Sequence, residues 1–323
     1  MTSFHDVLQA QKRILSFVHR TPVFTSATVD KLTGRKVFFK AEHLQKTGAF
    51  KARGAINAIL SLKEKNPKVP GVVTHSSGNH GMAVAWAAQI TGMNAVVVVP
   101  NNTPAIKAKA IEDYGAELVY CEPSPQSRIE TCKALSEKRN LTIIPPYDHY
   151  DVIAGQGTIA MELMEQVPEL DAILVPISGG GMTSGIAIAA KYMKPSIKVF
   201  AVEPKGKDLE KCLCAGERLW PNPPRFVNTI AEGIRTQQVG MLTFPILKEL
   251  VEKEVFTVTD DEMIQTMKFA MQRMKFVIEA SSAAGVAAVI SEKMKEMDPA
   301  IKNIGVILCG GNVDLDNLPW QAS

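Results

Sequence analysis

The sequence predicts an α/β protein with two lobes, each built on a mostly parallel β-sheet flanked by helices. Short runs rich in β-branched residues alternate with longer helical patterns, which is typical of parallel sheets. The chain has 323 residues, more than one compact core usually contains, so we expect a ligand cleft between two lobes. The predicted strands are residues 72–75, 95–99, 118–120, 173–177, 199–202 and 304–308.

The order of these elements predicts that the lobes are not consecutive in sequence. Three strands and their helices follow one another quickly between residues 72 and 145, which is enough for a small lobe. We expect a small, mobile domain at residues 67–148. Residues 1–66 and 149–323 then form a large, discontinuous domain.

Two helical segments are predicted from their spacing. After Lys51, apolar residues line one face at positions 52, 55, 56, 59 and 60. Thr259 and Glu262 have the spacing of a capping box and predict the start of a later helix. The methionines of that helix recur at helical spacing and are expected in the core: Met263, Met267, Met271 and Met274.

Composition and charge exclude several classes of partner. A net charge of +3 with interleaved acids and bases provides no basic stripe for nucleic acid or an anionic membrane. No apolar run reaches membrane-spanning length, and the N-terminal residues do not resemble a signal peptide. The five scattered cysteines indicate a reducing compartment and provide no paired zinc ligands. We therefore expect a cytoplasmic protein whose partner is a small molecule.

Lys51 is the first candidate for covalent chemistry. It follows a glycine-containing loop in KTGAFKARGA and is predicted to begin a helix. The positive end of a helix disfavours an ammonium and so favours the neutral amine that condenses with an aldehyde. A solvated lysine on a helix surface is the alternative, and this motif alone does not exclude it.

A polar turn between a strand and an apolar helix is the second candidate. Its residues are Ser76, Ser77, Gly78, Asn79 and His80 in HSSGNHG. Backbone N–H groups and short hydroxyls at such a turn suit a carboxylate, and the asparagine amide can donate to a phenolic oxygen. An ordinary helix N-cap, which is the alternative, does not need all five residues together.

Two further segments complete a candidate site. Gly179, Gly180 and Gly181 in VPISGGGM leave bare amides at a predicted helix start, which suits a phosphate. This segment has neither a P-loop lysine nor GxGxxG spacing, and a flexible turn is the alternative. Cys309 ends a predicted buried strand, where its thiol could face a ring nitrogen or could simply be an inert core residue. Together, the four segments predict a pyridoxal 5'-phosphate (PLP) site for amino acids.

The ordered motifs resemble those of the fold-type II PLP enzymes, in the serine racemase and serine/threonine dehydratase branch. The resemblance extends along nearly the whole chain, through RTPVFTSATVD, QKTGAFKARGA, HSSGNHG, VIAGQGT, SGGGM and CGGNVDL. It implies a tryptophan synthase β-like architecture with the cofactor in the cleft.

The resemblance implies a role for each residue of the PLP site. Lys51 would form the Schiff base, Phe50 would lie beside the ring, Asn79 would contact the phenolic oxygen, and Cys309 would face the ring nitrogen. The phosphate would be held by Ser178, Gly179, Gly180, Gly181 and Met182. Ser178 stands where the family usually has a fourth glycine.

The same resemblance favours racemisation of serine. Two bases must flank the α-carbon, and Lys51 and Ser77 would be that pair, since many dehydratases have alanine at the position of Ser77. Elimination of water from serine, giving pyruvate and ammonia, is expected to accompany racemisation. Tyr147 and the PYDHYDVIAGQG segment look dehydratase-like. A serine/threonine or 3-hydroxyaspartate dehydratase and an aspartate racemase therefore stay open, as does, from another class, a non-catalytic nucleotide-binding regulator.

A divalent cation is also implied, bound by Glu203 and Asp208. Magnesium, or calcium or manganese, would find oxygen ligands there. The segment EPKGKDL is one residue shorter than the family pattern and brings Lys207 close. A solvated acidic loop is the alternative.

Three further expectations follow from the resemblance. Arg128 would reach the substrate carboxylate, although a surface arginine is the alternative. ATP would bind at a subunit interface through Tyr114, Lys275 and Asn312, although Met82 replaces a polar residue there. The protein is expected to be a homodimer.

Overall fold

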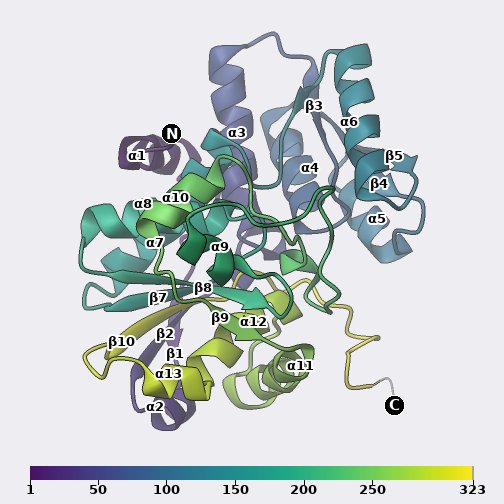
Figure 1. Ribbon diagram of the computed structural model, residues 1–323. Helices are drawn as coiled ribbons and strands as arrows, with labels where there is room; N and C mark the ends of the chain where they lie inside the picture. The colour runs from purple at the N-terminus through teal and green to yellow at the C-terminus, as the bar shows by residue number, and fades with distance from the viewer. Residues whose placement is uncertain (322–323) are drawn as a thin grey trace.

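The computed structural model describes residues 1–321 and contains two β-sheets (Figure 1). The larger sheet has the order β1-β2-β10-β7-β8-β9, and only β1 and β2 pair antiparallel. The smaller sheet has the order β5-β4-β3-β6 and is parallel throughout. The larger sheet contains β1 (Val23–Thr25), β2 (Lys36–Lys40), β7 (Ala172–Pro176), β8 (Lys198–Pro204), β9 (Phe256–Val258) and β10 (Asn303–Ile307). The smaller contains β3 (Gly71–Thr74), β4 (Asn94–Pro100), β5 (Glu117–Cys121) and β6 (Thr142–Ile143).

Each of the six predicted strands overlaps a strand of the structure, so the predicted α/β class with mostly parallel sheets is confirmed. Four strands were not predicted: β1, β2, β6 and β9. Three of them have only two or three residues, too few to show a periodic pattern. In β2 the three apolar residues lie between two lysines, Lys36 and Lys40, so the segment does not look like a buried strand. In the structure, however, Lys40 is fully buried.

Helices cover both faces of the larger sheet. One face packs against α1 (Phe4–Ile14), α7 (Tyr150–Gln166), α8 (Gly181–Met193), α9 (Leu209–Ala215) and α10 (Thr243–Leu250). The other face packs against α2 (Ala27–Thr33), α11 (Asp260–Phe269), α12 (Ala280–Ile290) and α13 (Glu292–Glu296). Within residues 1–321, every helix is too short or too polar to cross a bilayer.

The smaller sheet has a hydrophobic cluster on each face. In β4, Val97 and Val99 face one cluster and Val96 and Val98 the other, as the alternation of a buried strand requires. The accompanying helices are α4 (Asn79–Thr91), α5 (Ala105–Glu112) and α6 (Pro125–Arg139). The predicted domain boundaries remain a prediction, because α3 (Lys51–Lys65) packs against both α4 and α7.

The capping box at Thr259 is present, since its hydroxyl accepts from the Glu262 N–H group and the Glu262 carboxylate accepts from the Thr259 N–H group. Met263 and Met267 are buried, as predicted. Met271 and Met274 are only half-buried. The reason is that α11 ends at Phe269 and continues as a π-helical turn over Ala270–Met274, which changes the spacing.

Candidate active site

Lys51 begins α3, as predicted, and its amine lies near the C-terminal end of β10. The N–H group of the preceding residue, Phe50, donates to the Cys309 carbonyl at 3.0 Å. The Lys51 Nζ atom lies 5.1 Å from the Phe50 ring centroid and donates to the Pro146 carbonyl at 2.5 Å. Cys309 is therefore a neighbour of Phe50 and Lys51, although it lies far from them in the sequence.

The environment of Lys51 favours its neutral amine. Burial lowers the pKa of Lys51 to about 8, against the opposing influence of Cys309 and Glu279. The lowered pKa comes mainly from loss of solvation, and a neutral amine at Lys51 remains a prediction. An amine with a pKa near neutrality can condense with an aldehyde or take a proton from carbon.

The three glycines form a tight turn between β7 and α8. Gly179 and Gly180 are buried, and Gly180 has a φ of 92°, in the left-handed region that favours glycine. The carbonyl of Gly179 accepts from the Gly240 N–H group at 3.0 Å and from the Thr243 hydroxyl at 2.8 Å. A Cβ atom at Gly179 would overlap the Tyr147 ring. The close packing of Tyr147 thus explains why this position has no side chain.

We predict that Gly179→Ala weakens PLP binding by about tenfold to a hundredfold. The new methyl group must displace the Tyr147 ring or the turn, and overpacking of this kind costs about 1–3 kcal/mol. Fluorescence titration with PLP measures the effect. The double variant Gly179→Ala/Tyr147→Ala provides the control, since it removes the clashing ring and should regain part of the lost affinity. Unchanged affinity in Gly179→Ala would contradict a phosphate site at this turn.

The polar turn after β3 is held beside the amine by a chain of hydrogen bonds. The Asn79 amide group donates to both oxygens of Glu279, at 3.1 and 3.0 Å, and its carbonyl accepts from Asn312 at 2.9 Å. Ser76, Ser77 and Gly78 are partly buried between β3 and α4. They precede the start of α4 at Asn79, and a carboxylate site at this turn remains a prediction.

His80 has a structural position in this turn. Its Nε2 atom lies 2.9 Å from the Ile144 carbonyl, and its ring is buried. Burial lowers the pKa of His80 to about 3, with a smaller contribution from Lys51. The ring is therefore neutral and supports the turn from inside the smaller lobe.

Glu279 was missed by the sequence analysis and is part of the site. It is the N-cap residue of α12, and its N–H group donates to the Gly310 carbonyl at 3.1 Å. Burial raises the pKa of Glu279, while the hydrogen bond from Asn79 opposes that shift. The only signal in the sequence was a single acid before a run of small residues in FVIEASSAAG.

Cys309 keeps its proton. Burial raises the pKa of this thiol to about 12, and the nearby Glu279 adds to the shift. The Ser282 hydroxyl lies 3.4 Å from the Cys309 sulfur and donates to the Gly310 carbonyl at 2.6 Å. Cys309 thus presents a neutral, weakly polar group beside Lys51.

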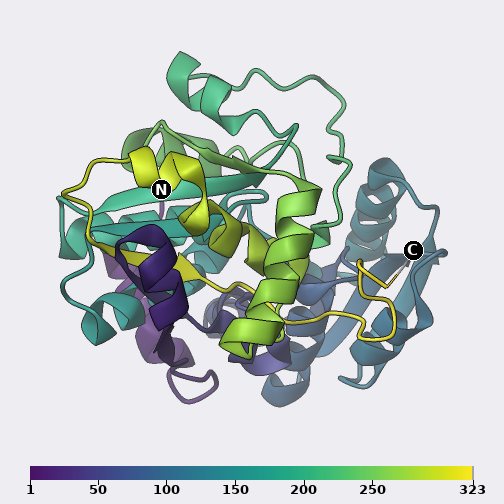
Figure 2. The same ribbon diagram turned by 90° about the horizontal axis from the view of Figure 1, so that it is seen from below.

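Arg128 lies at the boundary between the lobes. Its guanidinium carbon is 5.9 Å from the Phe226 ring centroid, and that of Arg235 is 4.7 Å from the same ring. Burial lowers the pKa of Arg128, and Arg235 adds to the shift. The segment between α9 and α10, which carries Phe226 and Arg235, extends from the larger lobe toward the smaller one in both views (Figures 1 and 2). Arg128 on α6 thus contacts a residue of the segment between α9 and α10, and its role toward the substrate carboxylate remains a prediction.

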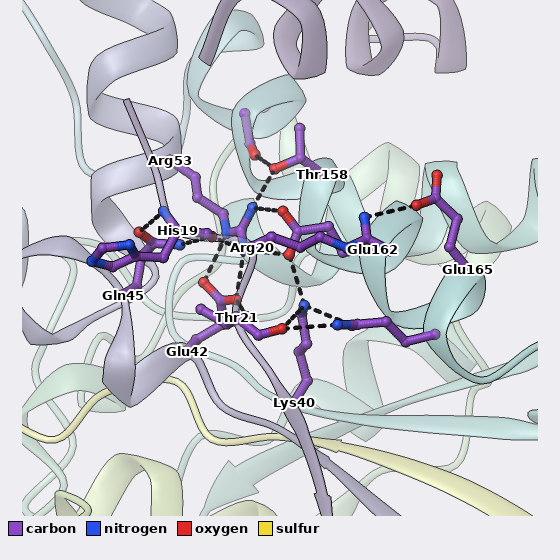
Figure 3. Close-up of polar contacts among 12 residues, drawn as sticks. His19, Arg20, Thr21, Lys40, Glu42, Gln45, Arg53, Thr158, Glu162 and Glu165 are labelled. Carbon is purple, nitrogen blue, oxygen red and sulfur yellow. Dashed lines mark hydrogen bonds and ion pairs between the residues drawn. The ribbon is translucent and has the colours of Figure 1, made fainter. Parts of the chain in front are cut away.

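A buried ionic network fixes the first turn of α3 (Figure 3). Arg53 is fully buried and donates to both oxygens of Glu42, each at 2.8 Å. It also donates to both oxygens of Glu162 on α7, at 2.7 and 2.9 Å. Lys40 of β2 donates to Glu162 at 2.7 Å and is itself fully buried. Since Arg53 is two residues from Lys51, this network sets the position of the reactive amine.

The two predicted metal ligands, Glu203 and Asp208, have different partners in the structure. Glu203 is buried and accepts from the Leu209 N–H group at 2.9 Å and from the Thr257 hydroxyl at 3.3 Å. Asp208 is exposed and pairs with Lys211 at 2.9 Å. Across residues 1–321, no cluster of three or more His, Cys, Asp or Glu residues has the arrangement of a metal site.

The predicted nucleotide residues lie on separate parts of the chain. Tyr114 packs against the core cluster between α3 and α4, and Lys275 has a left-handed backbone conformation after the π-helical turn. Asn312 belongs instead to the neighbourhood of Lys51, because it donates to Asn79 and to the Thr47 carbonyl. A shared nucleotide site for the three residues remains a prediction.

The residues around Lys51 fit pyridoxal phosphate. The amine has a lowered pKa, the glycine turn opens onto the N-terminus of α8, and a protonated thiol ends β10. Lys51 would hold the aldehyde carbon, the amides of residues 179–182 the phosphate, Asn79 the phenolic oxygen, and Cys309 the ring nitrogen. When bound, this cofactor withdraws electrons from the α-carbon of an amino acid.

Comparison with known proteins identifies the family. A family model described as "Pyridoxal-phosphate dependent enzyme" matches residues 14–310. The chain therefore belongs to this family of pyridoxal-phosphate dependent enzymes.

Several characterised relatives align over nearly the full chain. Serine racemase of Homo sapiens is 46% identical over 325 residues, covering 98% of this chain and 94% of the relative. A crystal structure of a pyridoxal 5'-phosphate-dependent aspartate racemase superposes with a TM-score of 0.97 at 54% identity, covering 99% of this chain and 98% of that one. The crystal structure of serine racemase from Dictyostelium discoideum superposes with a TM-score of 0.90 at 46% identity, covering 97% and 99% of the two chains.

Proposed function

We propose that this protein is a PLP-dependent serine racemase that also eliminates water from serine to give pyruvate and ammonia. The observation that supports this most directly is the position of the Lys51 amine, which lies close to Phe50 and Cys309. The turn that carries Ser77 is also near this amine, since Lys51 contributes to the pKa of His80 in the same turn. The human serine racemase at 46% identity supports the same activity.

The residues of the site support a reaction with one base on each face of the substrate. The neutral Lys51 Nζ atom takes the α-proton on one face, which its lowered pKa of about 8 favours. The Ser77 hydroxyl delivers a proton to the opposite face. Arg128 and the turn at residues 76–80 bind the substrate carboxylate. Cys309 retains its proton and would face the ring nitrogen of bound PLP as a neutral group. Such a partner would leave more negative charge at the α-carbon, which would favour loss of the β-hydroxyl together with a proton, as water.

We predict that Ser77→Ala lowers formation of D-serine from L-serine by about a hundredfold or more, the range expected for loss of one acid–base group. Pyruvate formation should change much less, because Lys51 still removes the α-proton. Chiral chromatography and a coupled pyruvate assay on the same samples measure both products. Exchange of the α-proton of L-serine in D2O should also persist.

Ser76→Ala is the matched control, since it removes the neighbouring hydroxyl of the same turn and should leave the ratio of the two products unchanged. Equal loss of D-serine and pyruvate in Ser77→Ala would contradict the proposed role of Ser77. A sample that does not bind PLP at all would favour a non-catalytic regulator.

Aspartate racemase is a second candidate, because the aspartate racemase structure is 54% identical to this chain. The paired guanidinium groups of Arg128 and Arg235 over Phe226 also offer charge for a second carboxylate. Initial rates with L-serine, L-threonine, L-aspartate and 3-hydroxyaspartate, followed for D-product and keto acid, separate racemases from dehydratases. A higher kcat/KM for L-aspartate than for L-serine would favour the second candidate.

The same assays address the remaining predictions. Magnesium and ATP are predicted activators. Initial rates with the four amino-acid substrates, measured with and without each of them, show whether they activate the enzyme. A homodimer and a cytoplasmic location also remain predictions, of which the first is measured by sedimentation of the holoenzyme.

A further inference from the structure

The loop after β8 contains a fully buried lysine that the proposed reaction does not use. Lys207 has no exposed surface. Its Nζ atom donates to the Gln237 carbonyl at 2.9 Å and also to the Thr236 carbonyl. Burial lowers the pKa of Lys207, and the carboxylate of Glu203 opposes that shift. The amine is thus enclosed by oxygen atoms and a nearby carboxylate.

The arrangement around Lys207 does not fit a divalent cation. Calcium takes about six to eight oxygen ligands and magnesium about six. Here both oxygens of Glu203 accept hydrogen bonds, and two backbone carbonyls already accept from Lys207. The second predicted ligand, Asp208, pairs with Lys211 and has 49% of its side chain exposed. A lysine amine occupies the acceptors that a metal would need.

Lys207 also connects this loop to the glycine turn. The residues that accept from it, Thr236 and Gln237, lie in the same segment as Gly240. The Gly240 N–H group donates to the Gly179 carbonyl at 3.0 Å. Anchoring residues 236–237 therefore helps to hold Gly240 against the turn that the phosphate requires.

We propose that the side chain of Lys207 takes the place of a divalent metal at this loop and, through its hydrogen bonds to Thr236 and Gln237, holds the 236–240 segment against the glycine turn. The enzyme is then independent of magnesium, calcium and manganese at Glu203.

Two measurements on the holoenzyme test this proposal without reference to the substrate. The first is binding of Mn2+ alone, followed by electron paramagnetic resonance up to about 1 mM, which covers weak protein sites. We expect no binding that depends on Glu203, so wild type and Glu203→Gln should give the same titration. Dialysis against EDTA should also leave the melting temperature of the wild type unchanged.

The second measurement is thermal unfolding of Lys207→Met beside Lys205→Met. Lys207→Met leaves the buried carbonyls of Thr236 and Gln237 without their donor and removes the amine near Glu203, so we expect the melting temperature to fall by roughly 5 °C or more. Lys205 is exposed and two residues away, so Lys205→Met should melt as the wild type does. PLP affinity should fall about tenfold or more in Lys207→Met only.

Either of two results would overturn the proposal. One is Mn2+ binding to the wild type that Glu203→Gln abolishes. The other is a Lys207→Met protein with the melting temperature and PLP affinity of Lys205→Met. If Lys207→Met does not fold, the Mn2+ titration of the wild type still decides.

Discussion

Replacing Lys51 with alanine is expected to abolish covalent attachment of PLP and to reduce turnover of every amino-acid substrate by about a thousandfold or more. In the proposed mechanism the same amine both links to the aldehyde and removes the α-proton, so its loss removes both functions at once. Borohydride reduction followed by peptide mapping locates the attachment in the wild type. Loss of the labelled peptide in Lys51→Ala, with an unchanged circular dichroism spectrum, is the expected result.

Lys65→Ala is the control, because Lys65 ends the same helix and its side chain is 68% exposed. The pH dependence provides a further check. Since the pKa of Lys51 is lowered to about 8, the rate at which PLP-free protein recombines with PLP should rise with pH and level off above about pH 8. Label at another lysine, or a rate that still rises toward pH 10, would contradict the assignment of Lys51.

Replacing Arg53 with methionine is expected to lower the free energy of unfolding by about 3–5 kcal/mol, because it leaves the buried carboxylate of Glu42 without its charged partner and Glu162 with Lys40 alone. Chemical denaturation monitored by circular dichroism measures the loss. PLP affinity should fall as well, since Arg53 fixes the turn of α3 that carries Lys51.

Arg20→Met is the matched control for Arg53→Met. Arg20 pairs with Glu165 at 2.8 Å, but the two side chains are 49% and 43% exposed, so this pair should contribute about 1 kcal/mol or less. Figure 3 shows both pairs in one view. A similar loss of stability in the two variants would contradict the structural role of Arg53.

The sequence was most informative where a local pattern determines the structure. The run of valines in β4 is typical of a buried strand. The small and apolar residues after Gly181 are typical of a buried helix. The turns at Ser77 and Gly180 were found because several unusual residues occur together in a fixed order. The start of α3 at Lys51 followed from the loop before it.

The parts that were missed depend on residues far apart in the chain. In the sequence, Arg53 looks like an ordinary residue on a helix surface. Its partners Glu42 and Glu162 are 11 and 109 positions away, so only the folded structure shows the pairing. Glu279 is likewise recognisable only once Asn79, 200 positions away, donates to it. The position of Lys207 could not be predicted, because it depends on backbone carbonyls of a segment with no regular structure.

The segment at residues 144–149, which joins the two sheets, contacts the site at three consecutive residues. The Pro146 carbonyl accepts from Lys51, the Tyr147 ring packs on Gly179, and the Asp148 carboxylate accepts from the N–H groups of the two residues just before α10. Any rotation of one sheet relative to the other must change the torsion angles of this connection and so shift all three contacts at once. Ligand affinity and interdomain angle are therefore energetically coupled, and by thermodynamic reciprocity each influences the other to the same extent.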